Sequence, residues 1–185
     1  TIPNILTLLR IALIPVFMIA YYLPVSWSHI ATTAIFGLAA ITDWFDGYLA
    51  RKLGQSSPFG AFLDPVADKL IVAVALVMLV QANPKWWFVI PAAVIVGREI
   101  AISALREWMA EIGERAQVAV SVIGKIKTTV QMVALLLLLY REPLWALPTR
   151  DIGIVLLYVA ATLTLWSMVI YLRAAWPVLS GNEKS

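Results

Sequence analysis

Six apolar stretches, each about as long as a bilayer is thick, run through this 185-residue chain. They cover roughly residues 4–24, 29–52, 61–82, 86–112, 121–141 and 150–175. A helix needs about twenty apolar residues to cross the hydrocarbon core of a membrane. Composition agrees, because 62% of the residues are hydrophobic, against roughly half in a soluble domain. The sequence therefore predicts an all-α integral membrane protein, a six-transmembrane-helix bundle.

Turn-forming residues separate the stretches, as expected for short connections between helices. They are Pro24, Asn83-Pro84, Gly113, Pro143 and Pro148. The sequence shows no internal repeat and no soluble appendage. We therefore expect a single membrane domain over residues 1–185.

Lysine and arginine are distributed unevenly between the two sides of the predicted bundle. Of 14 such residues, only Lys85, Arg141 and Arg150 fall on the side opposite the N-terminus. Because cytoplasmic loops carry the excess of positive charge, both termini are expected in the cytoplasm. The chain has no cysteine, which excludes a thiol nucleophile and a thiolate metal site.

Four carboxylates gather in a short segment of this otherwise apolar chain. Residues 43–51 read D-W-F-D-G-Y-L-A-R, and residues 60–68 read G-A-F-L-D-P-V-A-D. Asp43 and Asp46 are three residues apart, and Asp64 and Asp68 are four apart, so each pair shares one helix face. Two facing helices would bring all four side chains together at the cytoplasmic end of the bundle.

Such a group of carboxylates needs a cation. An acidic side chain in a membrane helix costs about 2.5–3.5 kcal/mol, and four together would also repel one another. Oxygen ligands without Cys or His favour hard cations such as Mg²⁺, Mn²⁺ or Ca²⁺, and two of them could clamp a diphosphate. The alternative is that the aspartates end their helices and are solvated by the cytoplasm.

Neighbouring residues are compatible with a phosphate ligand. Gly47 and Gly60 would let a bulky ligand approach the backbone, although glycine also serves helix packing in membranes. Arg51 could meet a phosphate oxygen or be ordinary cytoplasmic charge. Pro65 suits the first turn of a helix; this would leave Asp64 at the helix start and Asp68 one turn deeper, as a candidate base.

A second group of charges is basic. Arg98 and Arg106 lie eight residues apart and share a helix face, and Lys125 opens the next helix on the same side. Together they could bind a small dianion such as a phosphate monoester. Lys127 could replace Lys125, and the alternative is cytoplasmic charge paired locally with Glu99 and Glu107.

The first helix carries polar residues along one face. Asn4, Thr7 and Arg10 are spaced by three residues, so they follow one another along the helix. They are candidates for lining the mouth of an active site. An amphipathic helix start at the membrane surface would explain them equally well.

The acidic segment resembles the signature of the CDP-alcohol phosphatidyltransferase family, D-x2-D-G-x2-A-R-x8-G-x3-D-x3-D. The matching positions are Asp43, Asp46, Gly47, Ala50, Arg51, Gly60, Asp64 and Asp68. The resemblance implies a homodimer, a CDP-linked lipid donor and two divalent cations, Mg²⁺ or Mn²⁺. It implies that the first seven of these positions bind CDP. It also implies that all four aspartates bind metal and that Asp68 acts as the catalytic base.

Further stretches resemble one bacterial branch of the family. They are P-N-I-L-T-L-L-R at 3–10, G-R-E-I-A-I-S-A-L-R at 97–106, G-K-I-K-T at 124–128 and, for the proteobacterial members, A-L-R-E-W-M-A-E-I-G at 104–113. This implies transfer of a phosphatidyl group from CDP-diacylglycerol to sn-glycerol 3-phosphate, with release of CMP, on the cytoplasmic face of a bacterial inner membrane. Membrane lipid is an expected partner and nucleic acid is not.

Two other functions compete with this one. The same fold could serve another acceptor, such as serine or an inositol phosphate. An ion-coupled carrier could also use intramembrane acids. The charges, however, cluster at the cytoplasmic end, and no pair of broken helices marks a midplane site.

Overall fold

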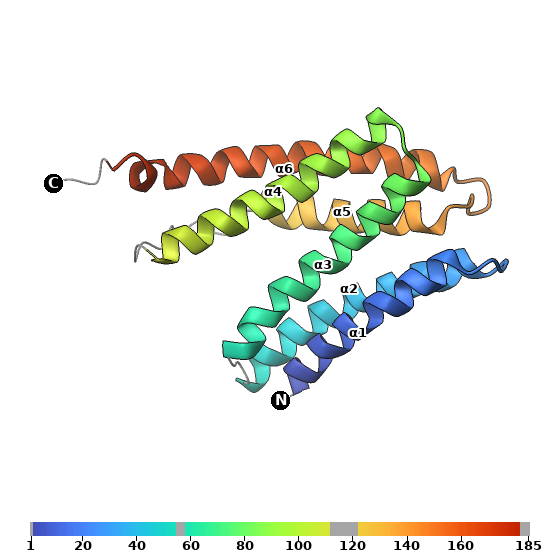
Figure 1. Ribbon diagram of the computed structural model, residues 1–185, viewed down its shortest axis with the longest axis horizontal. Helices are drawn as coiled ribbons and strands as arrows, with labels where there is room; N and C mark the ends of the chain where they lie inside the picture. Colours follow the sequence, from blue (N-terminus) through green and yellow to red (C-terminus); the bar gives the residue numbers. More distant parts are fainter. Residues whose placement is uncertain (1, 55–57, 112–121, 182–185) are drawn as a thin grey trace. The chain divides into compact units, whose positions relative to one another are not determined.

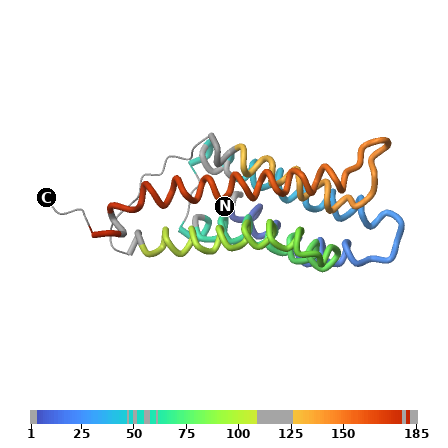
Figure 2. Tube along the Cα trace, turned by 90° about the horizontal axis from the view of Figure 1, so that it is seen from above, coloured from blue at the N-terminus to red at the C-terminus, as the bar shows by residue number. Residues whose placement is uncertain are grey.

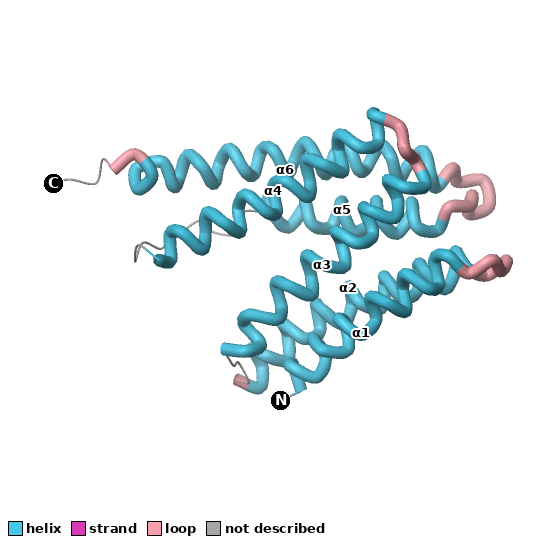
Figure 3. The backbone as a smooth tube through the Cα atoms, in the orientation of Figure 1, coloured by secondary structure: helices cyan, strands magenta, loops and turns pink. Residues whose placement is uncertain are grey.

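The structure, a computed structural model, describes residues 2–54, 58–111 and 122–181. Within these ranges the chain forms the six expected helices (Figures 1 and 3). The helices are α1 (Ile2–Tyr22), α2 (Ser28–Leu53), α3 (Pro58–Ala82), α4 (Trp86–Glu111), α5 (Val122–Tyr140) and α6 (Thr149–Leu179).

Three of the helices are long and apolar enough to cross a bilayer. Their candidate spans are Asn4–Tyr22, Trp86–Trp108 and Thr149–Pro177, and a shorter apolar segment covers Ile126–Tyr140. Within the described ranges, α2 and α3 are not among the candidate spans, and these are the helices that carry the aspartates. Several spans in one chain make this a multi-pass membrane protein.

The chain divides into two compact units. The first comprises Thr1–Ala82 with Leu135–Gly153, and the second comprises Asn83–Ala134 with Ile154–Ser185. The first contains α1 to α3, and the second contains α4 with most of α5 and α6. Each unit has buried apolar residues of its own.

The core of the first unit includes two fully buried aromatic rings, Phe17 on α1 and Phe36 on α2. Their centroids lie 5.9 Å apart. Figure 2 shows the turn that joins these two helices. Beside it, the Ser28 hydroxyl donates to the Ala20 carbonyl at 2.6 Å, and the Arg141 guanidinium lies 4.5 Å from the centre of the Tyr21 ring. These contacts fix one end of the α1–α2 pair, opposite the aspartates.

The core of the second unit includes a cluster of Ile102 on α4 with Tyr171 and Ala175 on α6. Leu105 and Met168 pack against it. The Tyr158 hydroxyl on α6 also donates to the Trp87 carbonyl. These contacts hold α4 against α6 and so position the polar residues of α4.

The start of α3 differs from the prediction. Pro65 was expected in the first turn, but α3 begins at Pro58 and Pro65 lies inside the helix. Pro58 itself satisfies the preference for proline at a helix start, whereas Pro65 removes one hydrogen bond within the helix. Asp64 and Asp68 therefore both lie inside the helix, one turn apart.

Gly153 lies where α6 approaches α5, and its lack of a side chain is required there. A Cβ at this position would lie 2.8 Å from Leu138 Cγ, whereas a Cβ at Gly37 would meet only Leu136 Cδ2, at 3.7 Å. We expect Gly153→Ala to lower the midpoint of thermal unfolding, because overpacking costs about 1–3 kcal/mol against a gain of about 1 kcal/mol in helix propensity.

The matched control is Gly37→Ala, which should leave the midpoint unchanged or raise it. Both variants would be compared with the parent protein in the same detergent. Equal midpoints for the two variants would contradict the close α5–α6 approach.

Candidate active site

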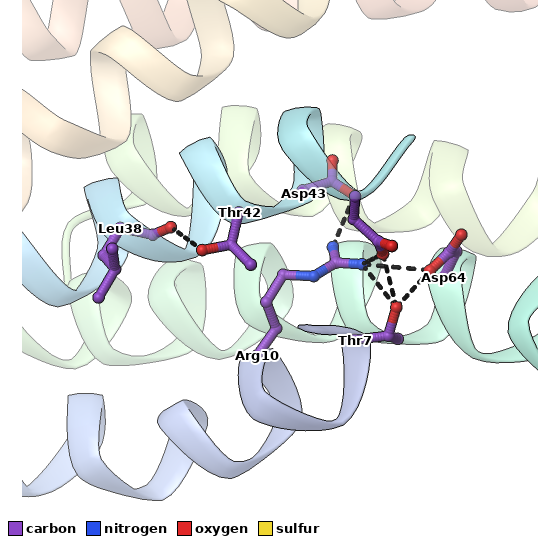
Figure 4. A network of polar contacts seen from close by, with 7 residues as sticks. Thr7, Arg10, Leu38, Thr42, Asp43 and Asp64 are labelled. Atoms are coloured by element: carbon purple, nitrogen blue, oxygen red, sulfur yellow. Dashed lines mark hydrogen bonds and ion pairs between the residues drawn. The ribbon is translucent and has the colours of Figure 1, made fainter. Parts of the chain in front are cut away.

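The Arg10 guanidinium bridges three aspartates from two other helices (Figure 4). Its Nη1 donates to Asp43 Oδ1 at 2.6 Å. Its Nη2 donates to Asp46 Oδ2 at 3.0 Å and to Asp64 Oδ1 at 3.3 Å. Arg10 lies on α1, Asp43 and Asp46 on α2, and Asp64 on α3. The structure therefore brings together three of the four predicted carboxylates.

Thr7, one turn before Arg10, completes this cluster. Its Oγ1 lies 2.6 Å from both Asp46 Oδ2 and Asp64 Oδ1, and it accepts a hydrogen bond from Arg10 Nη2 at 3.3 Å. A hydroxyl has one hydrogen and donates to one carboxylate at a time. The arrangement therefore depends on the Arg10 charge to hold both carboxylates close to this oxygen.

One part of the cluster is buried, and another part is open to solvent. Thr7, Arg10 and Asp46 are 0%, 3% and 1% exposed. The side chains of Asp43 and Asp64 are 39% and 42% exposed. A ligand would therefore reach the cluster over Asp43 and Asp64.

The chemistry of these residues fits a divalent cation. Among the described residues no group of three or more His, Cys, Asp or Glu side chains is arranged to hold a metal ion, and oxygens of three carboxylates contact the Arg10 guanidinium. The donors are nevertheless carboxylate and hydroxyl oxygens, as Mg²⁺ and Mn²⁺ prefer. Asp46 Oδ1 is also buried without a hydrogen-bond partner in the described part of the chain, so it has an acceptor position to offer.

The remaining residues of the acidic signature are close in sequence to the three clustered aspartates. Asp68 is half-buried on α3, one turn after Asp64, and Gly60 is buried in the first turn of the same helix. Gly47, Ala50 and Arg51 belong to α2, but their side-chain positions lie outside the part that the structure describes.

Asn4, Thr7 and Arg10 were predicted to follow one face of the first helix. Asn4 is half-buried, whereas Thr7 and Arg10 are fully enclosed and contact the aspartates. Sequence reasoning missed this direct contact. A signal was present, because Arg10 is the one charged residue in the sequence of α1, and a charge in a membrane helix requires a partner.

In the second unit, α4 directs two arginines toward α6. Arg98 Nη2 donates to Ser167 Oγ at 3.3 Å, and Arg106 lies 5.6 Å from the centre of the Tyr171 ring. Ser167 and Tyr171 are one turn apart on α6. The two arginines therefore share a face of α4, which is the arrangement that their eight-residue spacing predicts.

Lys127 joins these arginines from α5. It is 6% exposed, and its Nζ lies 3.5 Å from Glu99 Oε1, which also accepts from Arg98 Nη1 at 3.2 Å. The side chain of Lys125 lies outside the described part. Glu99 is thus a local partner of two cations, as the alternative interpretation expected.

Three polar atoms of the second unit are buried without a hydrogen-bond partner among the described residues: Arg98 Nε, Gln131 Oε1 and Thr164 Oγ1. Gln131 lies one turn after Lys127, and Thr164 precedes Ser167 by three residues. Buried polar atoms of this kind cost about 1–3 kcal/mol each. They are therefore candidates for contact with a polar ligand, and the sequence had not singled out Gln131 or Thr164.

Replacing Thr7 tests the hydrogen bonds between its hydroxyl and the carboxylates of Asp46 and Asp64. We expect Thr7→Val to destabilise the protein by about 1–3 kcal/mol, because the buried Asp46 carboxylate loses a donor. The measurement is the midpoint of thermal unfolding in detergent.

Thr42→Val is the matched control, since the Thr42 hydroxyl donates to the Leu38 carbonyl of its own helix at 2.7 Å (Figure 4). It should change stability by less than about 0.5 kcal/mol. A Thr7→Val protein as stable as Thr42→Val would show that the hydroxyl does not support the carboxylates.

Comparison with known proteins agrees with the acidic signature and extends over nearly the whole chain. Residues 1–166 match the family described as CDP-alcohol phosphatidyltransferase. Similar proteins include those of Escherichia coli (strain K12), Shigella boydii serotype 4 (strain Sb227) and Shigella flexneri. Each is a "CDP-diacylglycerol--glycerol-3-phosphate 3-phosphatidyltransferase", 59% identical over 174 residues, which is 94% of either chain. The chain belongs to the CDP-alcohol phosphatidyltransferase family.

Proposed function

We propose that this enzyme transfers the phosphatidyl group of CDP-diacylglycerol to sn-glycerol 3-phosphate. The products are phosphatidylglycerophosphate and CMP, and the reaction serves phosphatidylglycerol synthesis. The observation that carries the proposal is the convergence of Asp43, Asp46 and Asp64 in a chain 59% identical to enzymes named for this reaction.

We assign the acidic cluster to the nucleotide diphosphate of the donor. Two divalent cations, Mg²⁺ or Mn²⁺, held by Asp43, Asp46, Asp64 and Asp68, would neutralise the diphosphate and make CMP a better leaving group. The exposed sides of Asp43 and Asp64 give the diphosphate a direction of approach.

The other residues of the signature complete the donor site in this proposal. Gly47, Ala50 and Gly60 are small and would let the nucleotide lie close to the backbone. Arg51 would bind a phosphate oxygen through its planar guanidinium. The acyl chains of the donor would remain in the bilayer beside the site.

Asp68 acts as the base. It accepts the proton of the 1-hydroxyl of glycerol 3-phosphate, whose oxygen then forms a bond to the lipid-side phosphorus. The bond from this phosphorus to the bridging oxygen of CMP breaks, and CMP leaves with that oxygen. The position of Asp68, one turn from Asp64 and half-buried, supports a role close to the diphosphate.

We assign the basic residues of the second unit to the phosphate of the acceptor. Arg98 and Arg106, with Lys125 or Lys127, would offer charge-assisted hydrogen bonds to a phosphate monoester. The burial of Lys127 beside Glu99 supports Lys127 as part of this group. The unpartnered Arg98 Nε and Gln131 Oε1 are further groups for a polar ligand.

The proposed setting is a bacterial inner membrane, with six membrane-spanning helices and both termini in the cytoplasm. The distribution of lysine and arginine supports this orientation, which places the acidic cluster on the cytoplasmic side, where a water-soluble acceptor is available. We also propose that the enzyme is a homodimer and that residues 1–185 act as one catalytic domain.

The identity of the acceptor is tested by measuring the rate of CMP release from CDP-diacylglycerol, with Mg²⁺ or Mn²⁺ present and each acceptor supplied separately. We expect release with glycerol 3-phosphate and not with glycerol, serine or inositol phosphate. Asp68→Asn should lower the rate by about 10²–10⁴-fold, the usual contribution of a general base. Asp151→Asn, an exposed carboxylate in the first turn of α6, is the control and should keep the parent rate.

Each other outcome of this assay contradicts a named part of the proposal. Release with a different acceptor would keep the donor site and refute the acceptor assignment. Folded protein that releases no CMP with any acceptor would contradict the transferase and favour an ion-coupled carrier. An Asp68→Asn protein with the activity of the parent would show that Asp68 is not the base.

The phosphate-binding role of Arg106 predicts a selective effect. We expect Arg106→Ala to raise KM for glycerol 3-phosphate by about 10–100-fold, because a hydrogen bond to a charged group contributes about 1.5–3 kcal/mol. KM for CDP-diacylglycerol should not change. Arg173→Ala removes an exposed arginine of α6 and should alter neither constant, whereas equal rises in both constants for Arg106→Ala would contradict the assignment.

A further inference from the structure

Arg10 Nη2 occupies the point at which oxygens from three helices converge. It lies 3.0 Å from Asp46 Oδ2, 3.3 Å from Asp64 Oδ1 and 3.3 Å from Thr7 Oγ1. Figure 4 shows the Thr7 and Asp64 oxygens facing this nitrogen. A set of converging oxygens with excess negative charge is also what a hard cation requires.

Arg10 brings a positive charge to this point on a planar guanidinium that donates hydrogen bonds and accepts none. With Arg10 only 3% exposed, water screens this charge weakly. One positive charge faces three carboxylates. The guanidinium therefore holds together groups that would otherwise repel one another.

We propose that Arg10 is an internal counter-cation that competes with the divalent metal for Asp46 and Asp64 and so sets the metal affinity of the site. Metal binding then requires the guanidinium to leave these oxygens. This inference rests on the metal-binding role of the aspartates in the proposed function.

Competition follows from the shared oxygens. A small divalent ion takes its oxygen ligands at about 2.1 Å, and at that distance from Asp46 Oδ2 and Asp64 Oδ1 it would crowd and repel Nη2. Asp46 Oδ1, which has no partner among the described residues, offers an additional ligand atom that Arg10 does not use. The cluster can thus hold either cation, but both cannot share the same two carboxylate oxygens.

The proposal predicts opposite effects on two properties. Removing the Arg10 charge should weaken the fold when metal is chelated, because the carboxylates lose their counter-charge. It should also tighten metal binding, because a competing cation is gone. An arginine with only a structural role would lower stability without tightening metal binding.

The test compares the full-length parent protein with Arg10→Gln and Arg10→Lys. Gln removes the charge and keeps a hydrogen-bonding side chain, while Lys keeps the charge. All proteins are purified with Mn²⁺, and the affinity is measured by competition with a chelator while free Mn²⁺ is followed by electron paramagnetic resonance. A variant that unfolds without metal therefore still yields a value. Arg173→Gln is the control for charge removed elsewhere.

We expect Arg10→Gln to bind Mn²⁺ at least tenfold more tightly than the parent, and Arg10→Lys and Arg173→Gln to stay within about threefold of it. The unfolding midpoint of Arg10→Gln should fall below that of the parent in EDTA and approach it in saturating Mn²⁺.

Equal or weaker Mn²⁺ binding by Arg10→Gln would overturn the inference and leave the proposed metal site intact. A tenfold gain in Arg10→Lys as well would also overturn it, because the charge would then not be responsible. A parent protein that binds no Mn²⁺ would refute the metal site itself, and with it this inference.

Discussion

The ion cluster of Arg10 with Asp43, Asp46 and Asp64 is the interaction on which the first unit depends. Charged side chains are costly in a membrane helix unless they pair, and here one arginine pairs with carboxylates from two other helices. The cluster joins α1, α2 and α3 at one end, and the contacts of Ser28 and Arg141 join α1 and α2 at the other. The polar groups that we assign to the donor site therefore also join the helices of this unit.

The polar groups at the two proposed binding sites carry opposite charge: one arginine faces three carboxylates in the first unit, and two cations contact one carboxylate in the second. The proposed reaction would use both groups. The acidic cluster of the first unit suits cations and a diphosphate, while Arg98, Arg106 and Lys127 of the second suit an anion. Each group includes a local counter-charge, Arg10 in the first and Glu99 in the second. A buried charge without any partner would cost several kcal/mol, so these internal partners let both groups exist before a substrate binds.

The six helices could be predicted because apolar length and turn residues define membrane helices strongly. The spacing also predicted that the four aspartates would come together, and the structure shows this for Asp43, Asp46 and Asp64. The predicted start of α3 was wrong. Pro58 and Pro65 both suit the first turn of a helix, and the sequence alone does not show which of them begins it. The role of Arg10 was missed because periodicity gives the face of a helix but not the partner that it meets. For the same reason, sequence could not decide between Lys125 and Lys127.

In the proposed site, the aspartates of α2 and α3 hold the divalent cations of the reaction, and Arg10 moves away when they bind. Anomalous diffraction from crystals grown with Mn²⁺ and CDP would locate the cations and the arginine together. We expect Mn²⁺ peaks within about 2.5 Å of oxygens of Asp43, Asp46, Asp64 and Asp68, with the Arg10 guanidinium moved away from Asp46 and Asp64. Peaks elsewhere, or a guanidinium still between those two carboxylates beside bound metal, would contradict this proposal.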